Sequence, residues 1–219
     1  MATPSSSAIP GVTPPQQERS RETYERILDA VERLLLDRDF AQLRIEDALA
    51  EADVSIGSFY ARFSGKEALL PALVERYRVD VERLMQAPEL RLAADASLEA
   101  RAKAFVQTRV RRFQRRKGLL RALVIEQRRS PGPHHRELQE VARRANEQVV
   151  ALFMPRAQEI HGDARQTILR AMYFVSAICR DRILFGASPH ASVAPLPLSQ
   201  LEAELTRLML GYLRGSGLE

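Results

Sequence analysis

Apolar residues recur every three or four positions along most of this chain, which is the spacing of one face of an α-helix. The clearest stripe runs through residues 20–37, and its members are Tyr24, Ile27, Leu28, Val31, Leu34 and Leu35. A shorter stripe at Ile45, Ala48, Leu49 and Ala52 predicts about two turns of helix. The alternation typical of half-buried β-strands is not seen. The pattern therefore predicts an all-α fold.

A turn and a third helix are expected directly after the short stripe. Asp53 tolerates a left-handed backbone, Val54 is an apolar plug, and Ser55 is a favourable N-cap for a helix that starts at Ile56. Two short helices joined by such a turn form a helix-turn-helix, whose second helix enters the major groove of DNA. On periodicity alone, an ordinary helical hairpin fits equally well.

The third helix, over residues 56–63, divides into two expected faces. We expect an inward face that carries the large apolar side chains, Ile56, Phe59, Tyr60 and Phe63. We expect an outward face of smaller or polar residues, Gly57, Ser58, Ala61 and Arg62. Small outward side chains let the backbone approach another surface closely.

The remaining chain reads as further helices, which bring the total to about nine. They are expected at residues 65–86, 97–116, 119–129, 136–161, 163–187 and 199–214. Gly118 is expected to break one helix, and Pro155 to bend or interrupt another. The segments 130–135 and 188–199 are predicted loops.

This pattern predicts two domains behind a tail. Residues 1–18 are rich in Pro, Ser and Thr with almost no charge, which indicates a disordered tail. We assign residues 19–80 to an N-terminal helix-turn-helix domain, with the motif at about 45–64. Residues 81–219 are expected to form a helical domain for effector binding and dimerisation.

Composition limits the protein classes that fit. The 219 residues contain no run of 18 apolar positions, and the single cysteine, Cys179, excludes an internal disulfide framework, so we expect a soluble cytoplasmic protein without membrane contact. The net charge of +5 is uneven: residues 19–80 carry 10 basic and 13 acidic side chains, whereas residues 81–219 carry 23 and 14. DNA affinity must then rest on a few placed cations and on a dimer.

The stretch from Arg21 to Leu70 resembles the DNA-binding domain of the TetR/AcrR family of bacterial transcriptional regulators. The resemblance is carried by an S-x-G-x-x-Y-x-x-F run followed by Lys-Glu-x-Leu, at Ser55, Gly57, Tyr60, Phe63, Lys66, Glu67 and Leu69. It implies a double-stranded DNA operator as partner and contacts from Arg44, Ser55, Ile56, Gly57, Ser58, Tyr60, Arg62 and Lys66.

The chain departs from the family pattern at several positions of this stretch. Asp39 and Asp53 stand where glycine is usual, Ile56 where lysine is common, and Arg62 where histidine is usual. Leu43 and Arg44 replace the usual threonine cap of the second helix. These departures bear on the operator sequence more than on the fold.

The resemblance also implies a small-molecule effector and a homodimer formed by helices at about 163–187 and 199–214. Candidate pocket residues are Phe105, Arg109, Phe113, Met172, Tyr173 and Arg180, although a plain core position is the favoured account of most of the apolar ones. The effector is expected to be apolar. The arginines that crowd residues 109–129 suggest an anionic effector as a sharper hypothesis, although such a run is usually a solvated face.

The expected function is a ligand-responsive DNA-binding repressor. No motif for an enzyme occurs, such as G-x-S-x-G, a phosphate loop, HExxH or CxxC, and we expect no cofactor. Adjacent His134 and His135 are too weak a signal for a metal site. A helical interaction or carrier protein without operator binding is the alternative, because residues 19–80 are net acidic.

Overall fold

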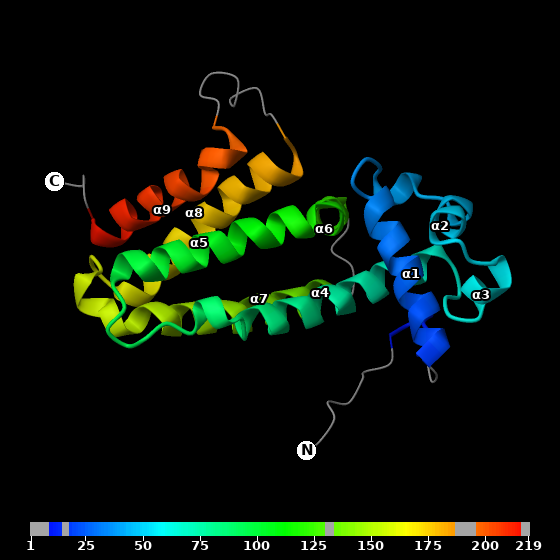
Figure 1. Ribbon diagram of the computed structural model, residues 1–219, viewed down its shortest axis with the longest axis horizontal. Coiled ribbons are helices and arrows are strands. Elements are labelled where there is room, and N and C mark those ends of the chain that lie inside the picture. The colour runs from blue at the N-terminus through cyan, green and yellow to red at the C-terminus, as the bar shows by residue number, and fades with distance from the viewer. Residues whose placement is uncertain (1–8, 15–17, 130–133, 187–195, 216–219) are drawn as a thin grey trace, which may run out of the picture. The chain divides into compact units, whose positions relative to one another are not determined.

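The computed structural model describes residues 9–14, 18–129, 134–186 and 196–215, and Figure 1 shows the course of the chain. Nine α-helices and no β-strand occur in this part of the chain, which confirms the predicted all-α class. They are α1 (Glu18–Leu34), α2 (Ile45–Ala52), α3 (Ile56–Tyr60), α4 (Leu69–Met85), α5 (Leu98–Arg115), α6 (Lys117–Arg129), α7 (His134–Phe153), α8 (Ala164–Cys179) and α9 (Leu198–Arg214).

Local signals account for most of the helix ends. Ser97 and Asp163 cap α5 and α8, since each side chain accepts a hydrogen bond from a backbone N–H three residues on. Pro155 lies in a 3-10 helix, Met154–Glu159, that follows the end of α7, as expected of a residue that interrupts a helix. Gly215 ends α9 in a left-handed conformation, with φ 70°.

The chain divides into two units, which are described separately below. The first unit consists of residues 1–79 and 118–138, and the second of residues 80–117 and 139–219. The predicted C-terminal domain included residues 118–138, whereas this segment belongs to the first unit, whose core contains Leu119, Ala122 and Leu123. Helix α4 contributes its first part to one unit and its last part to the other.

Gly118 explains why α6 belongs to the first unit. A Cβ atom at this position would lie 2.6 Å from the backbone oxygen of Glu32, so α6 packs directly on the backbone at the end of α1. Leu119, Ala122 and Leu123 then join the core of the first unit. Gly118 lies inside α6 and does not break a helix, because here glycine permits close approach.

The first unit has one hydrophobic core beneath the helix-turn-helix. It includes Ile27, Leu28 and Val31 of α1 together with Phe59, Phe63, Leu69 and Leu73. Tyr24 stacks on Phe63 with ring centroids 5.3 Å apart. Burial raises the pKa of Tyr24 to about 12, and the neighbouring Glu25 adds to this shift.

Arg76 of α4 joins α1 to α4 inside the first unit. Its guanidinium lies 2.5 Å from carboxylate oxygens of both Glu25 and Asp29 and 2.9 Å from Glu32, three residues on one face of α1. Burial alone would lower the pKa of Arg76, but the three carboxylates outweigh burial and raise it. The first part of α4 is therefore fixed to α1, the helix that supports the helix-turn-helix.

In the second unit, α5 packs against α8 and α9. Arg101 of α5 is buried, and its guanidinium donates to the carbonyl oxygens of Ala93, Ala94, Ala96 and Leu152 at 2.6–3.0 Å. It thereby attaches the segment before α5 to the end of α7. Helix α8 continues into a π-helical turn, Arg180–Leu184. Over the described residues, none of the helices combines the length and the apolarity needed to cross a bilayer.

Candidate nucleic-acid interface

The turn between α2 and α3 has the geometry of a helix-turn-helix. Asp53 ends α2 in a left-handed conformation, with φ 51° and ψ 55°. The guanidinium of Arg26 in α1 donates to the carbonyl oxygens of Ala52 and Asp53, at 2.6 and 2.7 Å. Ser55 caps α3, since its hydroxyl accepts from the Ser58 N–H at 3.2 Å. Support from α1 and the cap together fix where α3 begins.

The exposed face of α3 differs from the predicted one. Phe59 and Phe63 are fully buried, as predicted, but Ile56 is 57% exposed and Tyr60 is 54% exposed. Ile56 and Tyr60 are four residues apart and share a face, and the buried Phe59 and Phe63 share another. The prediction that Ile56 and Tyr60 face inward was therefore wrong.

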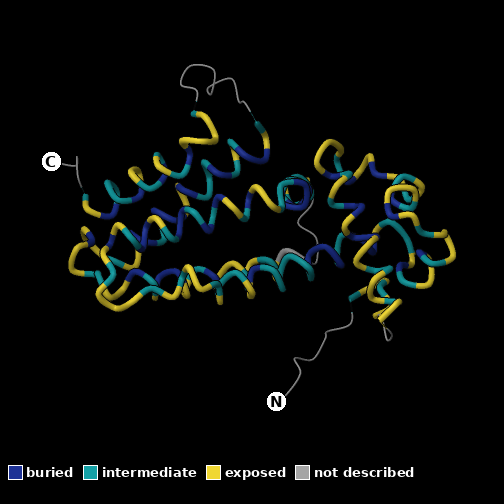
Figure 2. Tube along the Cα trace, in the orientation of Figure 1, coloured by how far each residue is buried: buried dark blue, intermediate teal, exposed yellow. Residues whose placement is uncertain are grey.

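A continuous accessible surface results at the head of α3. Ser55, Ile56 and Gly57 are exposed, and the stretch 55–57 is visible as such in Figure 2. A Cβ built at Gly57 would meet no atom within 4 Å, so this backbone is open to an approaching surface. An exposed isoleucine and an exposed tyrosine beside open backbone are suited to contact with base edges and sugars.

Arg62 is held by the protein backbone in this structure. Its Nε donates to the carbonyl oxygen of Ser20 at 3.1 Å, and another guanidinium nitrogen donates to that of Ser58 at 2.6 Å. These bonds attach the end of α3 to the start of α1. Sequence analysis offered Arg62 for a base contact or for adjustment of register, and the geometry supports positioning of α3; the base contact stays a prediction.

Lys66 and Arg44 lie on either side of α3 along the chain. The Lys66 ammonium donates to the carbonyl oxygen of Ala41 at 2.8 Å and lies 5.3 Å from the centre of the Phe40 ring. Arg44 precedes α2 with a largely exposed side chain, 3.7 Å from the Asp47 carboxylate. Both side chains retain N–H donors for a phosphate, because Arg44 is largely exposed and the Lys66 ammonium gives only one of its three N–H groups to Ala41.

Part of the tail predicted to be disordered lies against this motif. The Thr13 N–H donates to the Arg62 carbonyl at 2.8 Å, and the Ser64 N–H donates to the Gly11 carbonyl at 2.9 Å. Val12 and Phe63 form an isolated antiparallel bridge. Residues 9–14 are therefore ordered as a strap behind α3, and the rest of the tail up to residue 17 lies outside the described residues.

Sequence analysis missed two cations that the structure brings to this region. Arg19 and Arg21 are exposed in the first turns of α1, on either side of Ser20, whose carbonyl binds Arg62. Most other arginines of the first unit pair with carboxylates, for example Arg33 with Glu51 at 2.6 Å. The sequence contained a signal for their position, because the two arginines flank Ser20 at the expected start of the first helix.

The candidate pocket residues of the second unit line none of the three cavities found among its described residues. Phe105, Phe113 and Met172 are buried core residues, and the Arg109 guanidinium lies 4.9 Å from the centre of the Phe105 ring. Tyr173 is 63% exposed on the outside of α8. The side chains that line these three cavities are different ones. The pocket assignment stays a prediction.

The remaining candidates are Arg180, Cys179 and the adjacent His134 and His135. Arg180 is half-buried at the start of the π-helical turn. Burial raises the pKa of the Cys179 thiol to about 11, although Arg109 and Arg112 act in the opposite direction. The side chains of His134 and His135 lie outside the described residues.

Comparison with known proteins adds a family model and three solved structures. A family model described as bacterial regulatory proteins, tetR family, matches residues 27–73. The fold is similar to that of a tetR-family regulatory protein from Rhodococcus, with a TM-score of 0.66, 18% identity, and coverage of 87% of this chain and 96% of that one. The fatty acid degradation regulator FadR from Bacillus halodurans gives a TM-score of 0.66, 18% identity, and 88% and 96% coverage.

A tetR-family regulator from Mesorhizobium loti is similar over 90% of this chain and 98% of its own, with a TM-score of 0.66 and 17% identity. A search of curated protein sequences gives no match. At these identities the solved structures support the fold, and the family model covers α2, the turn and α3.

Proposed function

The chain belongs to the tetR family of bacterial regulatory proteins, and we propose that it is a ligand-responsive repressor that binds a pseudo-palindromic operator as a homodimer. DNA-binding regulation of transcription follows from the family, whose members are not enzymes. Repression, the dimer and the response to a ligand are our proposals, and each has its own structural support.

The exposed face of α3 carries the proposal. Ile56 and Tyr60 are large side chains with more than half of their surface exposed, although the buried core begins at the adjacent Phe59. Two large side chains exposed on one face of a short helix form an apolar patch, and such a patch is typical of a contact surface. With Ser55 and Gly57 they form a small surface suited to the major groove.

A second exposed apolar surface supports the homodimer. Across α8 and α9 of the second unit, Tyr173, Phe174 and Leu208 are all more than a third exposed. The rings of Phe174 and Tyr212 meet edge to face, 5.1 Å apart, so this surface spans both helices. Two copies joined through it would present two α3 helices to successive major grooves, about 34 Å apart on B-DNA.

An effector would act by favouring one of two arrangements of the dimer. A ligand shifts such an equilibrium only by its difference in affinity for the two states. We assign the effector to the second unit, where the described cavities lie outside the helix-turn-helix. A ligand preferred by the arrangement with the wrong half-site spacing would release the operator.

The test is binding of the full chain to DNA from upstream of its own gene, measured by fluorescence anisotropy. We expect an Ile56→Ala, Tyr60→Ala double variant to lose at least about tenfold in affinity, since it removes two contact side chains. Leu36→Ala is the matched control, because Leu36 is an exposed apolar residue that follows α1; its affinity should equal that of the wild type.

The alternative is a helical interaction or carrier protein without operator binding, which is favoured by the acidic balance of residues 19–80. It predicts no binding of the upstream DNA by the wild type, even at low salt, where phosphate contacts are strongest. Equal affinities for the wild type and the double variant would also contradict the proposed role of α3.

A further inference from the structure

One cavity of the second unit is lined by an unusual set of side chains. Its volume is about 460 Å³, and it lies between the end of α4, the 3-10 helix Pro88–Leu90 and α5. Its lining residues are Asp80, Arg83, Leu84, Ala87, Pro88, Glu89, Thr108, Arg111, Arg112, Arg115 and Arg116. We call it the α4–α5 groove. Its volume is in the range of small-molecule sites.

Each of the two helices contributes one face to the groove. The five α5-side residues, from Thr108 to Arg116, stand at positions i, i+3, i+4, i+7 and i+8. Asp80, Arg83 and Leu84 of α4 stand at i, i+3 and i+4, and Ala87 follows the end of this helix. These spacings normally carry the apolar stripe through which two helices pack. On α5 the stripe that faces the groove is arginine at every position after Thr108, so packing alone does not account for it.

The charges in the groove do not cancel. Five arginines face two carboxylates, those of Asp80 and Glu89, which leaves a net charge of +3. Arg116 pairs with Asp80, and Arg111 lies 3.8 Å from Glu89. Arg83 and Arg115 are exposed and have no carboxylate partner within the described parts of the chain.

The position of the arginines near the end of α5 offers a simpler account, because cations are favourable at a helix C-terminus by about 0.3–1 kcal/mol each. That effect acts within the last turn, and Arg111 lies further from the end. It also gives no reason for Arg83, which comes from α4. Like charges gathered in a concave site repel each other unless an anion joins them.

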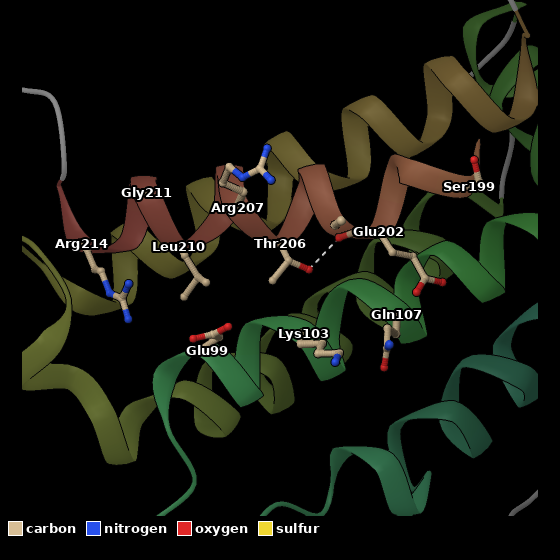
Figure 3. A pocket seen from close by; sticks show the side chains of 11 residues that line it. Glu99, Lys103, Gln107, Ser199, Glu202, Thr206, Arg207, Leu210, Gly211 and Arg214 are labelled. Carbon is tan, nitrogen blue, oxygen red and sulfur yellow. Dashed lines mark hydrogen bonds between the residues drawn. The ribbon is translucent and has the colours of Figure 1, made fainter. Parts of the chain in front are cut away.

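A second groove of this unit shows the contrast. About 720 Å³ in volume, it lies between α5 and α9, with Glu99, Lys103 and Gln107 facing Thr206, Leu210 and Arg214 across it in Figure 3. Three basic residues, Lys103, Arg207 and Arg214, stand against two acidic ones, Glu99 and Glu202. The charge there is nearly balanced, so this larger groove shows no comparable preference for anions.

We propose that the α4–α5 groove binds a small polyanion, which carries two or more carboxylate or phosphate groups, and that this polyanion is the effector. Planar guanidinium groups bind carboxylate and phosphate oxygens in a bidentate manner, and several arginines around one cavity favour several anionic groups over one. Leu84, Ala87 and Pro88 line the same cavity with apolar surface for a short carbon skeleton.

The regulatory part of this inference rests on the proposed function. Helix α4 runs unbroken from Leu69 to Met85. It carries Arg76, which is held by three carboxylates of α1, and then Asp80, Arg83 and Leu84, which line the groove. An anion that binds Arg83 and competes with Asp80 for Arg116 would change the forces on α4. The same helix is attached to α1, which supports the helix-turn-helix.

Calorimetric titration of the full chain with citrate and with inorganic pyrophosphate tests the site, at ionic strength matched with sodium chloride. We expect at least one of the two anions to bind, and uncharged glucose not to bind. The anion that binds more tightly shows whether the groove prefers carboxylate or phosphate groups. Arg83→Gln with Arg115→Gln should weaken binding by about tenfold or more, because two charge-assisted contacts are removed. Arg83→Lys with Arg115→Lys should retain more affinity than the glutamine pair.

The control is Arg143→Gln with Arg144→Gln, which removes the same charge from α7, where both arginines pair with Glu140 outside the groove. Equal loss of binding in both glutamine pairs, or no heat with either anion, would overturn the site. Operator affinity is measured separately, with and without the anion. Anion binding that leaves operator affinity unchanged would overturn the effector role, whereas absence of operator binding by the anion-free wild type would contradict the proposed function and not the site.

Discussion

Cationic side chains do different work in the two units. In the first unit they hold the backbone and acidic residues in place: Arg26 donates to the α2–α3 turn, Arg62 to Ser20, and Lys66 to Ala41. In the second unit, Arg83 and Arg115 line a groove with a net positive charge. Among the described residues, the first unit thus uses several of its cations to hold the backbone, whereas the second unit places Arg83 and Arg115 in a groove without a carboxylate partner.

The difference shows that residue type alone does not reveal which arginines contact a ligand. An arginine whose guanidinium binds carbonyl oxygens contributes to positioning, and its remaining N–H donors can still bind a ligand from the orientation that those bonds fix. An arginine without a partner can accept an anion at little cost. This contrast predicts modest electrostatic binding of DNA and strong selectivity of the second unit for anions.

Arg101 of the second unit is the sharpest exception to the contrast and gives the largest expected effect. It is buried and donates to four carbonyl oxygens, as a first-unit arginine does. Arg101→Ala should lower the free energy of unfolding by about 3–5 kcal/mol, because buried acceptors lose their donor. Chemical denaturation measures this, with the exposed Arg111→Ala as control; similar stability of the two variants would refute the role of Arg101.

The next largest effect is expected at the exposed apolar surface of the second unit, which we propose to be the dimer interface. A Tyr173→Glu, Leu208→Glu variant places charges in the proposed α8–α9 interface and should raise the dimer dissociation constant by about a hundredfold or more. Light scattering over a concentration series measures the oligomeric state. Met154→Glu, at an exposed apolar position outside α8 and α9, is the control. A dimer that persists in the double variant would contradict the proposed interface.

Arg62 tests whether a first-unit cation positions α3 or reads a base. Arg62→Gln should lower the free energy of unfolding by about 1–3 kcal/mol, since its bonds to Ser20 and Ser58 are lost. Operator affinity should fall without a change in base preference, measured on operators substituted at single positions. Relaxed preference at one base pair would instead identify Arg62 as a direct contact.

Arg19 and Arg21 should give the smallest effect. If each binds one phosphate per half-site, Arg19→Gln and Arg21→Gln should each reduce the slope of log K against log salt by about 1 per half-site, with unchanged base preference and unchanged stability. Anisotropy titrations over a salt series measure the slope. Arg33→Gln is the control, because Arg33 pairs with Glu51; an equal change there would remove the special role of the two arginines.

The sequence by itself determined the elements that depend on neighbouring residues. The stripe at Ile45–Ala52 coincides with α2, and Ser55 caps α3 as expected, since a cap needs only the next three residues. Pro155 ended α7 for an equally local reason. The match to the S-x-G-x-x-Y-x-x-F pattern identified the family, because this motif places its residues within a few turns of chain.

Only the tertiary structure decided which face of each helix is buried and which partner each cationic side chain binds. Ile56 and Tyr60 fit an apolar stripe, yet the core is filled by Phe59 and Phe63, which leaves the other face of a five-residue helix in water. Arg62 bonds to a carbonyl 42 positions away, and Gly118 packs on the backbone of α1. Such contacts join segments distant in sequence, and local periodicity contains no record of them, because it reports only neighbours within a few turns.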